Sequence, residues 1–305
     1  MAAKDKQARS VAQRIANQGR KLGLDRADAF TAYVMDRFLH RLGKSGQSKE
    51  FILKGGVLIA NLIEHPHRFT RDVDLLRRRG PAKPEDMRVR FTTILAGPSD
   101  DGIEFGPVRA VQSVREVDGY DGVKVRVTAR VGRNPVELQV DIGFGDAAVP
   151  KPARLDLSPF LEGTRPARIM AYATSTVIAE KTETLLGKFP VIRHRLKDLL
   201  DVVALAAVTE LDGATLQDAM TATFNRRGTR PDTATLDEMT EQMAGREWTR
   251  DWATMIQEKR VVDARNLAEA IADFDRLVRP ILLCMNAGHR LGSWKPGHGW
   301  EGAES

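Results

Sequence analysis

The sequence predicts an α+β protein whose first half mixes helices with strands and whose second half is helical. Two strictly alternating apolar segments, 123–129 and 136–142, predict strands, and a series of amphipathic segments beyond residue 175 predicts helices. Several prolines between residues 150 and 166 mark the change from one pattern to the other, so we place a domain boundary near residue 165.

The N-terminal region, 1–44, predicts two helices that pack on the core. Apolar positions recur at helical spacing from residue 5 to 44, and the glycines at 43 and 46 end the pattern. The second helix begins near Asp25 and carries one apolar stripe, which requires a partner surface.

The core, 45–165, begins with a short apolar strand, the glycine pair Gly55-Gly56 and a helix. A strand follows in which Asp72 and Asp74 alternate with apolar residues. The segments 123–129 and 136–142 predict a β-hairpin, because Gly132-Arg-Asn-Pro135 between them has turn chemistry. On the second hairpin strand, Asp141 shares the polar face with Glu137 and Gln139.

The region 166–288 predicts a helical domain, with helices near 175–188, 195–209, 216–225, 237–243, 249–258 and 267–285. A glycine-rich tail, 289–305, contains Trp294 and Trp300 and has no predicted element; either tryptophan would cap the domain or stack on a base.

Composition excludes several classes of protein. The apolar fraction of 42% and the charged fraction of 29% are those of a folded soluble domain. Cys284 is the only cysteine, so the chain forms no internal disulfide, and we expect it to be a buried small apolar residue in a reducing compartment. Charges at the N-terminus and the lack of a long apolar run exclude a signal peptide and a membrane span, which predicts a cytoplasmic protein. The net charge of +6 favours polyanionic partners.

The candidate chemistry rests on carboxylates. Asp72 and Asp74, two residues apart on a strand, place both carboxylates on one face, where they can share a divalent cation. The turn Gly55-Gly56 lets backbone N–H groups approach phosphate oxygens, and Asp141 supplies the third carboxylate of a two-metal phosphoryl-transfer site. Without these additions, a solvated strand end would be the favoured interpretation of the aspartate pair.

Basic residues surround the aspartates. Arg68, Thr70 and Arg71 precede the pair, and we expect the two arginines to contact phosphate or RNA, whereas Arg77 to Arg79 fit a solvated loop. The pair His65 and His67 could bind a metal ion, but the intervening proline favours a capped helix end. Asp146 is expected to be a turn residue.

Five motifs together resemble the AbiEii/AbiGii-type toxin nucleotidyltransferases of bacterial toxin–antitoxin systems, over about residues 45–210. They are Lys54-Gly55-Gly56, Arg68-x-Thr70-x-Asp72-x-Asp74, Val140-Asp141-Ile-Gly-Phe-Gly-Asp146, Glu180-Lys181 and Arg195-x-Lys197-Asp198-x-x-Asp201. The resemblance implies a DNA polymerase β-like nucleotidyltransferase core followed by a helical domain. Where family members have a glycine–serine turn, this chain has Gly55-Gly56, so backbone N–H groups must supply the whole phosphate cradle.

The resemblance also implies residue roles. Asp72 and Asp74 look like metal ligands, Lys181 like the cation that holds the triphosphate, and Asp198 like a further essential acid. Asp141 is a metal ligand or a general base, and both roles stay open. The predicted nucleotide-binding set is Lys54, Gly55, Gly56, Arg68, Thr70, Arg71, Lys181, Lys197 and Asp201. A surface salt bridge between Lys197 and Asp201, at helical i, i+4 spacing, is the alternative for that end of the motif.

The expected activity is transfer of a nucleoside monophosphate from a nucleoside triphosphate to RNA, with Mg²⁺, or Mn²⁺, as cofactor. The resemblance implies the 3′ end of tRNA as acceptor, a resulting block of translation, and a cognate antitoxin as partner. Two other functions stay open: a small-molecule nucleotidyltransferase of the antibiotic-modifying kind, which shares the glycine turn and the aspartate pair, and a nucleotide-binding scaffold without catalysis.

Overall fold

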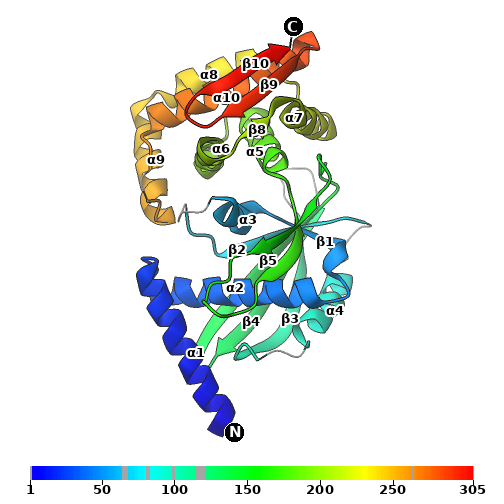
Figure 1. Ribbon diagram of the computed structural model, residues 1–305, viewed down its shortest axis with the longest axis vertical. Helices are drawn as coiled ribbons and strands as arrows, with labels where there is room; N and C mark the ends of the chain where they lie inside the picture. The colour runs from blue at the N-terminus through cyan, green and yellow to red at the C-terminus, as the bar shows by residue number, and fades with distance from the viewer. Residues whose placement is uncertain are drawn as a thin grey trace. The chain divides into compact units, whose positions relative to one another are not determined.

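The computed structural model describes residues 2–63, 68–79, 83–97, 100–114, 121–262 and 264–304, and it divides into two compact units (Figure 1). Unit 1 consists of residues 1–61, 70–145 and 153–171, and unit 2 of residues 62–69, 146–152 and 172–305. Several chain segments therefore connect the units. The pair His65 and His67 lies outside the described residues.

Unit 1 is built on a seven-stranded mixed sheet with the strand order β3-β4-β5-β2-β1-β7-β6. The pairs β2/β5 and β1/β7 are parallel and the other neighbours are antiparallel. This sheet confirms the predicted α+β class. The strands are β1 Phe51–Lys54, β2 Asp72–Arg77, β3 Ile103–Val114, β4 Asp121–Val131, β5 Asn134–Phe144, β6 Ala153–Leu157 and β7 Ala167–Ala171.

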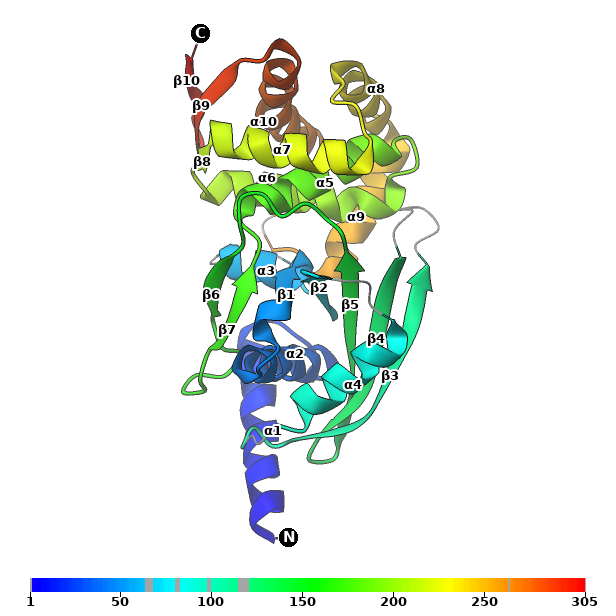
Figure 2. The ribbon, with the colours of Figure 1, turned by 90° about the vertical axis from the view of Figure 1, so that its right-hand side faces the viewer.

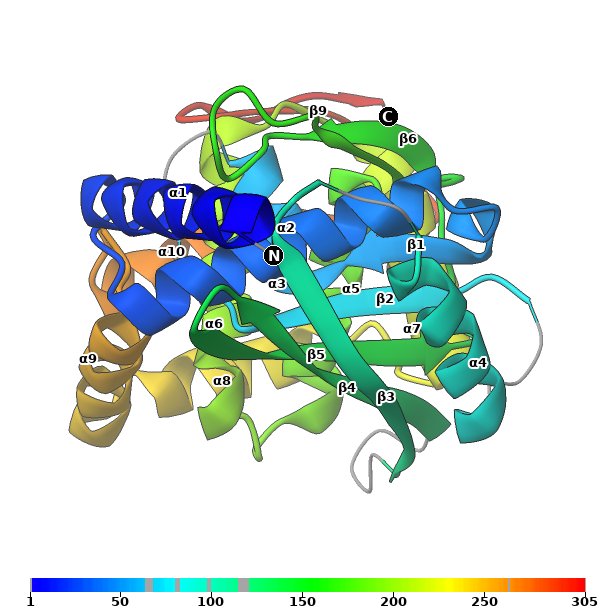
Figure 3. The same cartoon turned by 90° about the horizontal axis from the view of Figure 1, so that it is seen from below.

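The helices of unit 1 cover this sheet. They are α1 Ala2–Lys21, α2 Arg26–Lys44, α3 Gly55–Leu62 and α4 Pro84–Leu95, with the short 3₁₀ helix η1 Ser48–Glu50. Helix α2 is N-capped by Asp25, whose side chain accepts a hydrogen bond from the N–H of Asp28, and it packs on β7 and β5. Figure 3 shows α2 beside the strands of this sheet. The two predicted N-terminal helices and the predicted hairpin, now β4 and β5, are confirmed.

Helix α4 and strands β3, β6 and β7 of unit 1 were not predicted. Helix α4 buries Met87, Phe91, Ile94 and Leu95, whose i, i+4, i+7, i+8 spacing is a helical signal that the sequence analysis overlooked. Strand β3 follows it and forms one edge of the sheet. Strands β6 and β7 lie between prolines and pair with one another. Each has five residues, and a segment of that length is too short for its periodicity to be recognised.

Unit 2 consists mainly of helices, and each of the six predicted helices is present (Figure 2). Helix α5 contacts both α6 and α7, and α10 packs on α6 and α8. The helices are α5 Thr174–Lys188, α6 Leu196–Val208, α7 Gly213–Arg227, α8 Thr233–Met243, α9 Arg246–Lys259 and α10 Leu267–Ala287, with the 3₁₀ helix η2 Arg193–Arg195. Within the described ranges of the chain, no helix is both long and apolar enough to cross a membrane.

The C-terminal tail is ordered as part of a three-stranded sheet, β10-β9-β8, formed by β8 Leu211–Asp212, β9 Arg290–Lys295 and β10 Gly299–Glu304. Trp294 is buried and its indole N–H donates to the carbonyl of Ala206 at 2.8 Å. The Trp300 ring meets it edge-on at 5.6 Å between centroids, and its N–H donates to the carbonyl of Leu277. Both tryptophans therefore join the tail to the helices of unit 2.

Candidate functional site

The predicted carboxylates of unit 1 lie on one face of the sheet. Strands β2 and β5 pair in parallel, so that Asp74 lies opposite Asp141 and Asp72 opposite Gln139. Side chains of directly opposed residues point to the same face, and those two residues along a strand do so as well. Asp72, Asp74 and Asp141 therefore share a face, whereas Val73 and its neighbours on the other face form the buried core.

Two lysines extend this arrangement across four adjacent strands. Lys54 on β1 lies opposite Asp74, and Lys124 on β4 lies opposite Asp141. The charged row, as we call Lys54, Asp74, Asp141 and Lys124, thus has the two acids in the middle and a cation at each end. Lys124 is not among the residues predicted from the sequence. The hairpin turn at Val131 and Asn134 fixes its register, and counting back from that turn would have placed it opposite Asp141.

Asp141 is a partly buried acid. Its side chain is 16% exposed, and the Gln139 amide donates to its Oδ2 at 3.3 Å. Its Oδ1 is buried without a hydrogen-bond partner, and the Lys124 ammonium lies 3.5 Å away. An unsatisfied buried acceptor of this kind costs about 1–3 kcal/mol. A hard cation bound to Oδ1 would offset that cost.

The glycine turn is shaped around Asp74. Gly55 has a φ of +67°, a left-handed conformation that residues with a β-carbon avoid. A β-carbon at this position would lie 1.9 Å from Asp74 Oδ2 and 2.5 Å from its Cγ. The backbone at the start of α3 therefore passes directly beside the carboxylate, and only glycine permits that approach.

The donor set of this face consists of carboxylate oxygens, the kind of ligand that a hard divalent cation such as Mg²⁺ takes. In the part of the chain that the structure describes, no three or more His, Cys, Asp or Glu side chains converge closely enough to hold a metal ion by themselves. Asp72 Oδ1 accepts a hydrogen bond from the Thr70 hydroxyl at 2.6 Å. Mg²⁺ is commonly held by one or two carboxylates together with waters and phosphates, and the opposed oxygens of Asp74 and Asp141 supply that number.

The arginines beside the aspartate pair are engaged within the protein. Arg71 forms two hydrogen bonds to the buried Asp28, at 2.9 and 3.1 Å, although its own side chain is 62% exposed. Arg77, expected in a solvated loop, is instead buried at the end of β2 and pairs with Asp86 of α4 at 2.8 Å. The expectation was wrong for Arg77, because the strand continues through that residue, whereas Arg78 and Arg79 are exposed as expected.

Four of the predicted residues form a buried ionic cluster in unit 2. The Lys181 ammonium on α5 lies 2.5 Å from Asp198 Oδ1 and 2.7 Å from Asp201 Oδ2. Arg68 donates two hydrogen bonds to Asp201, at 2.6 and 2.8 Å. Asp201 is fully buried, and Arg68 and Lys181 are 6% and 13% exposed. We call Arg68, Lys181, Asp198 and Asp201 the ionic cluster.

The ionic cluster bears on two expectations from the sequence, the Lys197–Asp201 salt bridge and the contact of Arg68 with phosphate or RNA. Asp201 is enclosed by Arg68 and Lys181, so the surface salt bridge with Lys197 is not the arrangement found. Arg68 was expected to contact phosphate or RNA. In the structure its guanidinium donates two hydrogen bonds to Asp201. Burial lowers the pKa of Lys181, but the carboxylates of Asp198 and Asp201 outweigh it and the pKa is raised above its usual value. The lysine is therefore a cation at neutral pH.

A second charged group in unit 2 was missed by the sequence analysis. Arg227 on α7 pairs with Glu183 at 2.5 Å and lies 3.6 Å from Asp146 and 4.0 Å from Glu180. Asp146, expected to be only a turn residue, thus contributes to this group. The Tyr172 hydroxyl donates a hydrogen bond to Glu180 at 3.0 Å, and burial raises the pKa of Tyr172.

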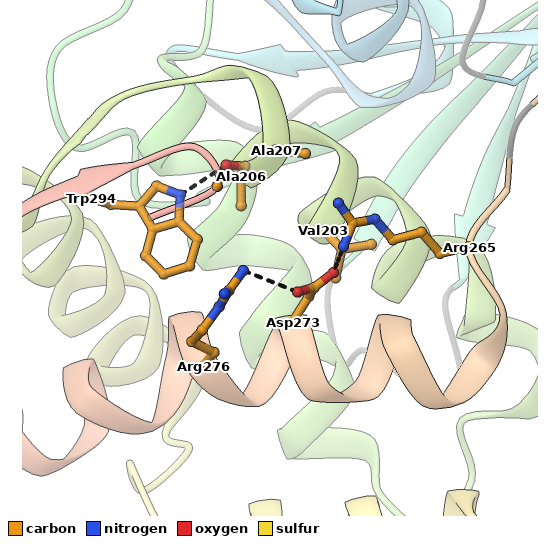
Figure 4. Close-up of a pocket in the computed structure, with 8 residues that line it drawn as sticks. Val203, Ala206, Ala207, Arg265, Asp273, Arg276 and Trp294 are labelled. Carbon is orange, nitrogen blue, oxygen red and sulfur yellow. Dashed lines mark hydrogen bonds and ion pairs between the residues drawn. The ribbon is translucent and has the colours of Figure 1, made fainter. Parts of the chain in front are cut away.

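Unit 2 also contains a pocket of about 150 Å³ that is lined by none of the predicted catalytic or nucleotide-binding residues (Figure 4). Arg265 and Arg276 both pair with Asp273 at its rim, and the Arg276 guanidinium lies 5.5 Å from the centre of the Trp294 ring. Because its charged groups are already paired with one another, the pocket offers little that would hold a charged ligand.

Comparison with known proteins gives one family. The family model described as "Nucleotidyl transferase AbiEii toxin, Type IV TA system" matches residues 37–279. A search of curated proteins gives no match. Among solved structures, "Crystal structure of JHP933 from Helicobacter pylori" is similar, with 15% sequence identity, a TM-score of 0.47, and coverage of 83% of this chain and 90% of that chain.

Proposed function

Since the chain belongs to the AbiEii family of nucleotidyl transferase toxins of type IV toxin–antitoxin systems, we propose that it transfers a nucleoside monophosphate to the 3′ end of an RNA. The acceptor we propose is tRNA, and loss of a usable tRNA 3′ end would block translation. The observation that carries the proposal is the opposed pair Asp74 and Asp141 beside the Gly55 turn.

We propose Asp74 and Asp141, with Asp72 beside them, as the groups that would hold Mg²⁺, or Mn²⁺. When bound, the ion would supply positive charge that offsets the phosphate oxygens and lowers the pKa of the acceptor hydroxyl. The buried Asp141 Oδ1 that lacks a hydrogen-bond partner supports a ligand role for Asp141. The hydrogen bond from the Gln139 amide to Asp141 Oδ2 orients the carboxylate.

In the proposed reaction the acceptor hydroxyl oxygen forms a bond to the α-phosphorus, and the bond from that phosphorus to the bridging oxygen breaks. Pyrophosphate leaves, and the hydroxyl proton passes to solvent or to a carboxylate of the aspartate pair. The N–H groups of the Gly55-Gly56 turn would donate to phosphate oxygens. The close approach of the Gly55 backbone to Asp74 would bring those phosphates next to the acids.

We propose Lys181 as a triphosphate-binding cation and Asp198 as a further essential acid. The raised pKa keeps Lys181 positively charged, as a triphosphate-binding cation must be. Both of its carboxylate partners lie within 2.7 Å, so binding a phosphate oxygen would require one of these ion pairs to open. Loss of transfer in a Lys181→Met variant that still folds would support this role.

RNA as acceptor is supported by the net charge of +6, which favours polyanions. Membership of a toxin–antitoxin family implies a nucleoside triphosphate substrate and a cognate antitoxin. The two competing functions are a nucleotidyltransferase with a small-molecule acceptor and a nucleotide-binding scaffold without catalysis. The labelling experiment described next distinguishes them from the proposed function.

The test incubates the purified full chain with total bacterial RNA, Mg²⁺ and each α-labelled nucleoside triphosphate in turn. Wild type is compared with Asp74→Asn and Asp141→Asn on a denaturing gel. Asp156→Asn is the matched control, because Asp156 is an exposed aspartate of the same sheet that pairs with Arg168. We expect label in a tRNA-sized band from wild type and the control, and at least about 100-fold less from the other two.

Two results would contradict the proposal. Equal labelling by Asp74→Asn and wild type would show that the aspartate pair does not carry the reaction. Absence of label in RNA with all four triphosphates would reject the RNA acceptor; label then found on an aminoglycoside-like acceptor would establish the small-molecule function.

A further inference from the structure

We infer that Lys124 is an internal counter-ion of the aspartate pair, which neutralises Asp141 in the empty site and moves to the triphosphate when a metal ion binds. The inference rests on the proposed function, since it assumes that the pair Asp74 and Asp141 takes a divalent cation. It adds a residue that the sequence motifs do not contain.

The position of Lys124 is set by the hairpin. Lys124 lies opposite Asp141 on the adjacent antiparallel strand, and its ammonium is 3.5 Å from Asp141 Oδ1. A strong charge-assisted hydrogen bond would be about 2.7–2.9 Å long. Oδ1 accordingly has no hydrogen-bond partner. The contact is therefore mainly electrostatic, and the ammonium is not fixed in one geometry.

The charge pattern of the row explains why a cation is needed there. Asp74 and Asp141 are like charges directly opposite one another, an arrangement that destabilises a sheet unless positive charge lies nearby. Lys54 and Lys124 occupy the two ends of the charged row and supply that positive charge. A divalent cation between the acids would supply the same positive charge and would repel the Lys124 ammonium.

Lys124 is able to move. Its side chain is 27% exposed, so the ammonium can remain hydrated when it leaves Asp141. The four-carbon stem is flexible and carries three rotatable donors. Because Lys124 points to the face that carries the aspartates, a triphosphate bound there is the nearest new anion.

The inference makes two predictions of opposite sign. Removing the ammonium removes a competitor of the metal ion, so the metal alone should bind more tightly. It also removes a partner of the triphosphate, so the metal–triphosphate complex should bind more weakly. A lysine that only stabilises the fold would change neither binding constant once the variant is folded.

The experiment measures binding of Mn²⁺ alone by electron paramagnetic resonance, and of preformed Mn²⁺–inorganic triphosphate by calorimetry, to the full chain. Lys124→Met is compared with Lys49→Met, which removes the same charge at an exposed position of unit 1. We expect Lys124→Met to bind Mn²⁺ about threefold to tenfold more tightly and the triphosphate complex about fivefold more weakly. Lys49→Met should match wild type in both.

Lys124→Arg is the second variant and covers the case in which Lys124→Met does not fold. A guanidinium binds a carboxylate through two parallel hydrogen bonds, so it should hold Asp141 more firmly and weaken Mn²⁺ binding. If wild type binds Mn²⁺ and Asp141→Asn does not, but both Lys124 variants bind it like wild type, the counter-ion role is overturned and the metal site stands. If wild type binds no Mn²⁺, the metal site itself is rejected.

Discussion

Gly55 and Asp74 are so close that a β-carbon on residue 55 would lie 1.9 Å from the Asp74 carboxylate. The glycine also has a φ of +67°, so the turn depends on glycine for its backbone conformation and for the space beside the acid. This contact joins the phosphate-binding turn to the proposed metal ligand.

Replacing Gly55 by alanine should affect both the position of the Asp74 carboxylate and the stability of the fold. Gly55→Ala is expected to displace the Asp74 carboxylate and to lower RNA labelling by about 100-fold, since a shift of about 1 Å in a reacting group costs that much. The left-handed φ should cost a further 1–2 kcal/mol of stability, roughly. Labelling and urea unfolding measure the two effects.

Gly46→Ala is the control, because nothing lies within 4 Å of a β-carbon there and its φ is not positive. It should label and unfold like wild type. Full labelling by Gly55→Ala would show that the turn has no part in the reaction.

Asp201 should be essential to the stability of unit 2. Asp201→Ala leaves Arg68 buried without the carboxylate that accepts two hydrogen bonds from its guanidinium. Breaking a buried ion pair in this way costs about 3–5 kcal/mol, which urea unfolding of the full chain would measure. Asp156→Ala removes an exposed aspartate from an arginine pair and should leave stability near the wild-type value. Equal effects of the two substitutions would contradict the buried cluster.

His40 should make stability depend on pH in the mildly acidic range. Burial, with Arg37 and Lys44 nearby, lowers the pKa of His40 below its usual value of about 6.5. The unfolded chain therefore binds a proton more readily, so this contribution to stability is present above pH 6.5 and is lost as the pH falls through and below it. Stability measured from pH 8 to 5 should fall less steeply in His40→Gln than in wild type. The exposed His298→Gln serves as control and should keep the wild-type slope.

Trp294 should attach the C-terminal sheet to the helices. Trp294→Ala removes a buried ring and the hydrogen bond to Ala206, and we expect a loss of about 3–5 kcal/mol in unfolding free energy. Val191→Ala, at a side chain that is 67% exposed, should change stability little. A small effect of Trp294→Ala would mean that the tail is not needed for the fold of unit 2.

Local patterns determined much of this protein. Alternation along 72–75 and 136–142 identifies strands and predicts that Asp72 and Asp74 share one face, because the side-chain period of a strand follows from its backbone. Helical periodicity locates the helices of the second half within a few residues, and the five motifs indicate the AbiEii family.

Only the tertiary structure decided which of these residues meet. The parallel pairing of β2 with β5 places Asp141 opposite Asp74 and not opposite Asp72, and the ionic cluster brings Arg68 to Asp201, 133 residues away. Such contacts depend on strand register and helix packing between distant segments. Strand register and helix packing are set by the burial of whole apolar faces, so the spacing of residues along the chain does not determine them.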